Sequence, residues 1–362
     1  MVISDKEMAS SSVRSGTASD RGTTRTSRDK FGPAPVQMAD PLFILAAPRS
    51  FSSVVCAMLG EHPQMYGLPE THLFSEERLS GWHARAPRES HAMEHGLLRA
   101  VAQLCYGEQS EKSVRRAAAW LLRRGTTTTG MIFEELALRV SPAILVDKSP
   151  SMVYLPESMQ RAHRFFPQAK FIHLVRHPVG QGRSVMNYRS VLAKPEYHAK
   201  DRETQAGTAP EWVNNLASFP YFPAPQNHGY DSSEVDPQRG WYVLNRNIVE
   251  FLSTVPDHQR MTVHGEDLLT EPEQELVKIT HWLNIRDDDE AIEHMKHPEL
   301  SPYAFFGPAQ ARCGNDIFFL QDPRLRPTRA KPQSLEGPLP WRSDGRGLLA
   351  ETKELARLLG YQ

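Results

Sequence analysis

The sequence predicts an α/β fold with a P-loop-like central parallel sheet flanked by helices. Residues 42–59 and 170–188 carry most of this prediction, because each is an apolar run followed by a tight polar loop and a helical pattern. Further apolar runs alternate with helical patterns along the chain, which is typical of parallel sheets with strands buried on both faces. With 362 residues and 40% hydrophobic content, the chain can form a large core.

Composition excludes several classes of function. A formal net charge of −1 gives no overall attraction to nucleic acid or an acidic membrane, so we expect neither partner, and any anion site must be local. The three cysteines, Cys56, Cys105 and Cys313, are far apart and lack C-x-x-C spacing, which argues against disulfides and thiolate metal sites and favours a cytoplasmic setting. Apolar runs fall short of the roughly 20 residues that span a bilayer.

The chain begins with a segment that we do not expect to fold. Residues 1–38 are rich in Ser, Thr, Gly and Arg and show no periodicity, which predicts a disordered arm before a single domain at 39–362. The arginines leave a transit peptide as an alternative, and acidic residues count against it: Asp5, Glu7, Asp20 and Asp29.

The first strand-loop-helix unit predicts an anion site. A strand over 42–47 runs through Pro48-Arg49-Ser50-Phe51 into a helix over 52–59. Such a loop aims free backbone N–H groups at one point. The side chains that can converge there are Arg49, Ser50, Ser52 and Ser53. Because the loop lacks the glycines and lysine of G-x-x-x-x-G-K-[ST], we expect a phosphate to bind without a Walker-type magnesium.

Two further segments place polar residues near this loop. A strand around 65–68 would end beside it, which brings Glu70 and His72 near the anion; the alternative is a surface glutamate and a helix-cap neighbour. A strand over 143–147 is followed by Lys148, whose side chain can point into the same crevice. The alternative is a solvated lysine before a helix. We expect that helix over 152–166.

Between these strands lie three helical patterns, at 93–106, 112–124 and 129–140, which predict a helical cover on the sheet. The motif His91-Ala-Met-Glu94-His95 matches the H-x-x-E-H metalloprotease pattern. Because a match of five residues in a surface segment is weak, we expect no metal.

The second strand-loop-helix unit predicts a second phosphate site. A strand from Lys170 ends at Arg176, a helix starts at Pro178, and Arg176 and Ser184 can grip a phosphate together. Gly180 and Gly182 lower helix propensity and permit close approach. The alternative is an ordinary strand-turn-helix.

The remaining chain continues the alternation. Residues 191–237 lack periodicity and predict a lid or acceptor insertion, and 307–316 is glycine-rich and can close over a ligand. We expect helices over 237–255, 272–283, 288–295 and 348–359, and a strand over 261–264.

Taken together, residues 40–330 resemble sulfotransferases that use 3′-phosphoadenosine 5′-phosphosulfate (PAPS). Ala47-Pro48-Arg49-Ser50-Phe51-Ser52-Ser53 is similar to their 5′-phosphosulfate loop, and Arg176-x-Pro178 with Ser184 is similar to their 3′-phosphate motif. Asp147-Lys148-Ser149-Pro150 and Glu266-Asp267-Leu268-Leu269 are similar to their D-K-[ST]-P and E-D-L segments. Leu68-Pro69-Glu70-Thr71-His72-Leu73 resembles a segment of bacterial members, some of which act on hydroxylated polyketide chains.

The resemblance implies PAPS as co-substrate, no metal, and a small-molecule or carrier-bound hydroxyl acceptor; it leaves a homodimer open. Catalytic roles are implied for Glu70 as base, His72 as its substitute, and Lys148 and Arg49 as stabilisers of the transferring group. The cofactor-binding residues would be Arg49, Ser50, Phe51, Ser52, Ser53, Arg176, Ser184, Arg312 and Gly314.

One departure is Phe51, where the family has glycine, so its side chain must point away from the phosphosulfate or narrow the acceptor pocket. Two alternatives to a sulfotransferase stay open at this point. They are a P-loop-type nucleotide kinase and a non-catalytic nucleotide-binding protein.

Overall fold

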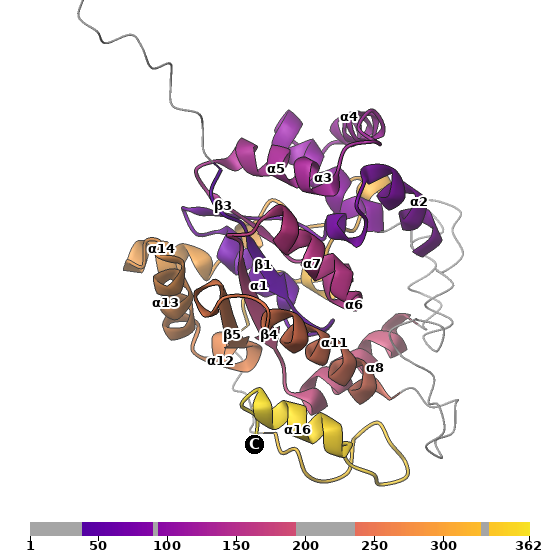
Figure 1. Ribbon diagram of the computed structural model, residues 1–362, viewed down its shortest axis with the longest axis vertical. Helices are drawn as coiled ribbons and strands as arrows, with labels where there is room; N and C mark the ends of the chain where they lie inside the picture. The colour runs from indigo at the N-terminus through magenta and orange to yellow at the C-terminus, as the bar shows by residue number, and fades with distance from the viewer. Residues whose placement is uncertain (1–37, 90–92, 193–235, 327–332) are drawn as a thin grey trace, which may run out of the picture. The chain divides into compact units, whose positions relative to one another are not determined.

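A five-stranded parallel sheet forms the centre of the part of the chain that the structure describes (Figure 1). The computed structural model describes residues 38–89, 93–192, 236–326 and 333–362. The strands are β1 (Leu42–Leu45), β2 (Met65–Gly67), β3 (Ile144–Asp147), β4 (Lys170–Val175) and β5 (Arg260–His264). Their spatial order is β2–β3–β1–β4–β5, with every neighbouring pair parallel. The predicted fold class is confirmed.

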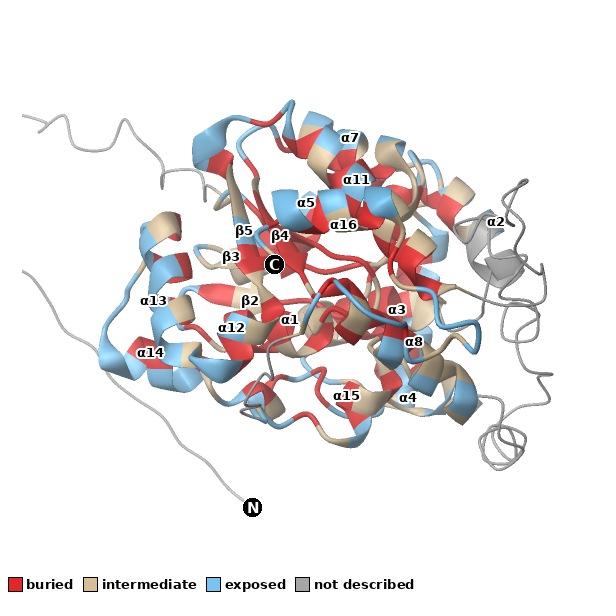
Figure 2. Ribbon diagram, turned by 90° about the horizontal axis from the view of Figure 1, so that it is seen from below, coloured by how far each residue is buried: buried red, intermediate tan, exposed pale blue. Residues whose placement is uncertain are grey.

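Alternation along β1 divides the core into two halves, because successive strand residues point to opposite faces. Phe43 and Leu45 pack with the helices of one face, and Leu42 and Ile44 pack with those of the other. The first face carries α3 (Met93–Tyr106), α4 (Glu111–Leu122), α5 (Thr129–Val140), α6 (Ser151–Tyr154), α7 (Pro156–Phe165) and α11 (Pro237–Leu252). The second carries α1 (Ser52–Gly60), α12 (Gly265–Thr270), α13 (Pro272–Leu283) and α14 (Asp289–Met295). Figure 2 shows the buried residues gathered in the strands and the inner faces of these helices.

A third apolar cluster lies at the end of β4. Val175 and Trp241 pack there with residues of the C-terminal helix α16 (Ala350–Leu358). The other described helices are α2 (Leu79–Glu89), α8 (Pro178–Leu192) and α15 (Ile317–Gln321). The α8 helix starts at Pro178, as expected for a residue whose fixed φ suits the first helical turn.

One expectation about local structure was wrong. The helix expected over 152–166 is two helices, α6 and α7, with Leu155 extended between them (φ −120°, ψ 124°). Pro156 causes this break, because proline disfavours helical backbone in the preceding residue. The strand β2 lies at the edge of the sheet, with β3 between it and β1. Its end still brings Glu70 to the first loop, because Lys148 contacts both Glu70 and Ser53.

Several expectations fall outside the described residues. They are the arm over 1–37, most of the lid over 193–235, and His91 of the H-x-x-E-H pattern, so the domain limits stay a prediction. Within the described ranges, every helix is too short or too polar to cross a bilayer.

Candidate active site

The carboxyl ends of the parallel strands bring four predicted residues to one edge of the sheet. Arg49 follows β1, Glu70 follows β2, Lys148 follows β3 and Arg176 follows β4. The strands β2 and β3 lie on one side of β1, and β4 and β5 lie on the other, so the chain changes sides at β1. Open α/β sheets bind their ligands at such a switch point.

The first loop leads into α1, whose N-terminus is suited to an anion. Its N-cap residue, Phe51, makes no side-chain capping bond, and the first turn contains no acidic residue, so its N–H groups and dipole are uncompensated there. Both Arg49 (φ 71°) and Phe51 (φ 65°) adopt left-handed backbone that favours glycine. Such conformations persist only where the surroundings enforce them.

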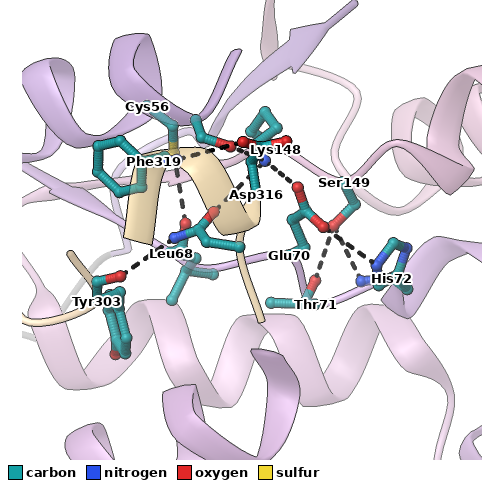
Figure 3. Close-up of polar contacts among 12 residues, drawn as sticks. Cys56, Leu68, Glu70, Thr71, His72, Lys148, Ser149, Tyr303, Asp316 and Phe319 are labelled. Atoms are coloured by element: carbon teal, nitrogen blue, oxygen red, sulfur yellow. Dashed lines mark hydrogen bonds and ion pairs between the residues drawn. The ribbon is translucent and has the colours of Figure 1, made fainter. Parts of the chain in front are cut away.

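Lys148 is the buried cation of the site. Its side chain is 2% exposed, and its ammonium donates to Ser53 Oγ (3.0 Å), to Asn315 Oδ1 (3.5 Å) and to Glu70. Figure 3 shows the Lys148 and Glu70 side chains pointing toward each other. The alternative of a solvated lysine is therefore wrong.

Glu70 is held as a carboxylate chiefly by Lys148. Burial alone would raise its pKa, but Lys148 and His72 outweigh burial, and the pKa lies below its ordinary value. His72 Nε2 lies 3.8 Å from Glu70 Oε2, and the Glu70 backbone N–H donates to Gly314 O (2.8 Å). The side chain is 18% exposed, so it is open on one side, and the alternative of a plain surface glutamate is wrong.

A network that sequence reasoning missed fixes the backbone after Glu70. Thr71 Oγ1 donates to Asp147 Oδ1 (2.8 Å), and so does Ser149 Oγ (3.2 Å). The His72 N–H donates to Ser149 Oγ (2.9 Å), and Figure 3 shows Thr71, His72 and Ser149 side by side. His72 needs this support because its φ is 53°. Asp147 is fully buried, and burial raises its pKa to about 6. The D-K-[ST]-P pattern was the signal, but the lysine alone was given a role.

Arg49 is largely buried, and its guanidinium contacts residues of α8 and of the segment 316–318. Its guanidinium forms an ion pair with Asp316, and its Nε donates to Ser184 Oγ (3.3 Å). Its guanidinium carbon lies 4.9 Å from the Tyr188 ring centre and 5.1 Å from that of Phe318. Burial lowers the Arg49 pKa. Asp316, Tyr188 and Phe318 were not predicted, although Asp316 ends the segment expected to close over a ligand.

Arg176 joins the second loop to the first. Its Nη1 donates to Arg49 O (2.8 Å), and its guanidinium carbon lies 4.0 Å from the centre of the Phe51 ring. Burial lowers the Arg176 pKa to about 10. Arg176 and Ser184 thus both contact Arg49, so the two strand-loop-helix units meet at this residue. Their assignment to a phosphate stays a prediction.

The glycines Gly180 and Gly182 permit close approach by side chains. A Cβ on Gly182 would lie 2.3 Å from the Trp341 ring, and one on Gly180 would lie 2.9 Å from Gln333 Nε2. The start of α8 is therefore packed tightly by the C-terminal part of the chain.

The segment 307–316 does reach the site. Gly314 has φ 97° and packs against Gly96 of α3, where a Cβ on Gly314 would lie 2.8 Å from Gly96 Cα. Arg312 lies over the Phe306 ring, 4.9 Å from its centre. Binding of the donor by Gly314 and Arg312 stays a prediction; in the structure Gly314 supports Glu70.

A search of the described residues finds no group of three or more His, Cys, Asp or Glu that is arranged to hold a metal. His95, from the H-x-x-E-H pattern, accepts from the Cys313 N–H at Nδ1 (3.2 Å).

Comparison with known proteins identifies the family. A model of the sulfotransferase family matches residues 41–222, half of the chain. The sulfotransferase domain of an olefin synthase from Synechococcus PCC 7002 is 26% identical, with a TM-score of 0.62, and the match covers 91% of this chain and 98% of that domain. The sulfotransferase domain of the curacin biosynthetic pathway shares the fold at 20% identity (TM-score 0.58, 90% and 99% covered). No curated protein gives a significant match. The chain belongs to the sulfotransferase family.

Proposed function

We propose that the protein transfers the sulfuryl group of PAPS to a hydroxyl of a small-molecule or carrier-bound acceptor. The observation that carries this proposal is the convergence of Lys148, Glu70 and Arg49 at the uncapped N-terminus of α1. This set combines two cations and an anion-binding helix end with one ionised carboxylate, which is what transfer of an anionic group to a hydroxyl requires.

The donor would lie across the two loops. The N-terminus of α1, with Arg49 and the serines of the first loop, suits the 5′-phosphosulfate. Arg176 and Ser184 suit the 3′-phosphate, because the second loop contacts the first at Arg49. Phe51 does not block this arrangement. Its ring packs on Gly265, after β5, whereas Glu70 follows β2 at the opposite edge of the sheet.

The transfer itself involves one bond formed and one broken. The acceptor oxygen bonds to sulfur while the bond between sulfur and the 5′-phosphate oxygen breaks, and the acceptor proton passes to Glu70. Lys148 stabilises the negative charge that develops on the leaving oxygen. Because such transfers depend on positioning and electrostatics, the residues of this chain supply the needed groups.

The comparisons support the acceptor class. One matched structure is a domain of an olefin synthase and the other belongs to a biosynthetic pathway, which favours a small-molecule or carrier-bound acceptor.

All three cysteines are free, which supports a reducing, cytoplasmic setting.

Two measurements test the proposal. Labelled PAPS with a library of hydroxyl acceptors should yield a sulfated product, and calorimetry should show that 3′-phosphoadenosine 5′-phosphate binds much more tightly than ATP. Loss of each charge-assisted bond at Arg176 costs about 1.5–3 kcal/mol, so Arg176→Ala should lose most of this preference. Equal affinity for ATP, or turnover of ATP, would favour a kinase. Tight binding of PAPS without transfer to any acceptor would favour a non-catalytic binding protein.

A further inference from the structure

Phe51 adopts a backbone conformation that is unfavourable for its residue type. Its φ of 65° and ψ of 10° lie in the left-handed region, where a side chain is strained and glycine is not. A phenylalanine keeps such a conformation only if its ring makes contacts that hold it there. The contacts of the ring therefore indicate what the residue does.

One contact of the ring is made with Gly265, the first residue of α12. A Cβ on Gly265 would lie 2.6 Å from Phe51 Cδ2, closer than real Cβ contacts allow. Gly265 itself does not have a positive φ, so its backbone does not require glycine. The absence of a side chain at Gly265 is what makes room for the Phe51 ring.

The ring also packs against the apolar cluster that contains Leu42 and Ile44. Its polar contact is the Arg176 guanidinium, which lies over the ring with its carbon 4.0 Å from the ring centre. Nη1 of the same group donates to Arg49 O (2.8 Å), whereas Nε is buried and makes no hydrogen bond to any described residue. The ring and the Arg49 carbonyl thus fix the plane and the rotation of the guanidinium, and Nε stays available as a donor. A cation held on an aromatic face in this way loses little freedom when an anion binds.

We propose that Phe51 is a specificity-determining residue, which positions Arg176 to recognise the 3′-phosphate of the donor. The proposal rests on the proposed function. It assigns to Phe51 a role that glycine at this position cannot have, since glycine offers no ring to stack on Arg176.

The test measures a ratio of affinities, which a general effect on folding does not change. Calorimetry gives the affinity for adenosine 3′,5′-bisphosphate and for adenosine 5′-monophosphate, which differ only in the 3′-phosphate. In Phe51→Leu, which keeps apolar bulk but has no ring, the preference for the bisphosphate should fall about 5- to 30-fold. Affinity for the monophosphate should stay within about twofold. Phe51→Tyr, which keeps a ring, should retain the preference.

A double-mutant cycle with Gly265 gives an independent test. Gly265→Ala should displace the ring and lower the preference in the parent protein. It should have no such effect in a Phe51→Gly background, where there is no ring to displace. Phe51→Gly relieves the backbone strain, so this background should fold well.

The outcomes separate this inference from the proposed function. A parent protein that shows no preference for the bisphosphate would overturn both. A preference that persists in Phe51→Leu and Phe51→Gly would overturn only the role of Phe51. Equal losses of affinity for both nucleotides would also overturn it, because Phe51 would then shape the whole loop.

Discussion

At the scale of single residues, the main feature is the pair formed by Glu70 and Lys148. The buried ammonium keeps the neighbouring carboxylate ionised, and the carboxylate satisfies the ammonium where water is scarce. Breaking such a pair leaves the remaining charge uncompensated, so each partner should be changed to a residue that still forms hydrogen bonds. This guides the choice of variants.

Glu70→Gln should lower turnover by about 10² to 10⁴, the usual effect of removing a positioned base, while affinity for 3′-phosphoadenosine 5′-phosphate stays nearly unchanged. His72→Ala should lower turnover less, because the imidazole lies 3.8 Å from the Glu70 carboxylate, which remains in place as the base. Arg49→Ala should weaken both turnover and donor binding. Steady-state kinetics and calorimetry check these effects. Near-full activity in Glu70→Gln together with its loss in His72→Ala would transfer the role of base to His72.

At the scale of elements, α3 and the segment 307–316 contact the backbone of Glu70 and hold it in position. A Cβ on Gly96 of α3 would lie 1.9 Å from Glu70 O, so the backbones of the helix and of the Glu70 segment are in contact. Arg99 of α3 binds the other side of the same segment, with Nη1 donating to Cys313 O (2.8 Å). The position of Glu70 therefore depends on the packing of a helix far from it in sequence.

Gly96→Ala should destabilise the protein and lower turnover. Helix propensity alone predicts the opposite, because alanine favours a helix interior by about 1 kcal/mol over glycine. The clash with Glu70 O decides the sign. Urea unfolding and steady-state kinetics measure the two effects. Gly125→Ala is the control, since its Cβ would meet nothing closer than 3.8 Å. A more stable, fully active Gly96→Ala would show that the clash is absent.

His173 in β4 should make stability depend on pH. It is 1% exposed, its Nε2 lies 2.9 Å from Asn245 Oδ1, and burial lowers its pKa from 6.5 to about 4. Between these values the unfolded chain binds a proton that the folded protein does not. His173 therefore contributes stability above pH 6.5, which is lost as the pH falls toward 4, by up to about 1.4 kcal/mol per pH unit.

The variant His173→Gln lacks this titration. The difference between its free energy of unfolding and that of the parent should therefore shrink as the pH falls from 7 to 4.5. Urea unfolding at several pH values measures the difference. The exposed His281 supplies the control, because His281→Gln should follow the parent curve. Parallel curves for His173→Gln and the parent would mean that His173 titrates normally.

At the scale of the whole molecule, the strand order places the first loop at β1 and the second at β4, its neighbour. The carboxylates of the site are engaged by cations or hydroxyls, and the described residues contain no group of three or more His, Cys, Asp or Glu arranged to hold a metal. Turnover should therefore be unchanged in a chelator such as EDTA, assayed after dialysis. Loss of activity that zinc or magnesium restores would contradict this and return attention to the His91–His95 pattern.

The sequence was sufficient to predict those parts of the fold and the site that depend on neighbouring residues. Each strand-loop-helix unit lies within some twenty residues, so periodicity and the turn residues predicted the first and second loops. Contacts between distant segments were not predictable in this way. Asp316 meets Arg49 across 267 positions, and nothing in the pattern around either residue indicates the other. The strand order was not predicted for the same reason, because it depends on packing across the whole sheet.

The ion pair between Arg49 and Asp316 has a consequence for any anion that binds the first loop. Asp316 Oδ1 accepts from the N–H groups of Phe318 and Phe319 at the start of α15, and Oδ2 contacts Arg49. The carboxylate can therefore release Arg49 and still cap its helix. The Asp316 carboxylate therefore competes with any anion for Arg49. The apparent dissociation constant of such an anion equals the intrinsic one divided by the fraction of molecules in which Arg49 is not paired with Asp316. Binding at this loop is an exchange of one counter-ion for another, so the measured affinity is a difference between two ion pairs.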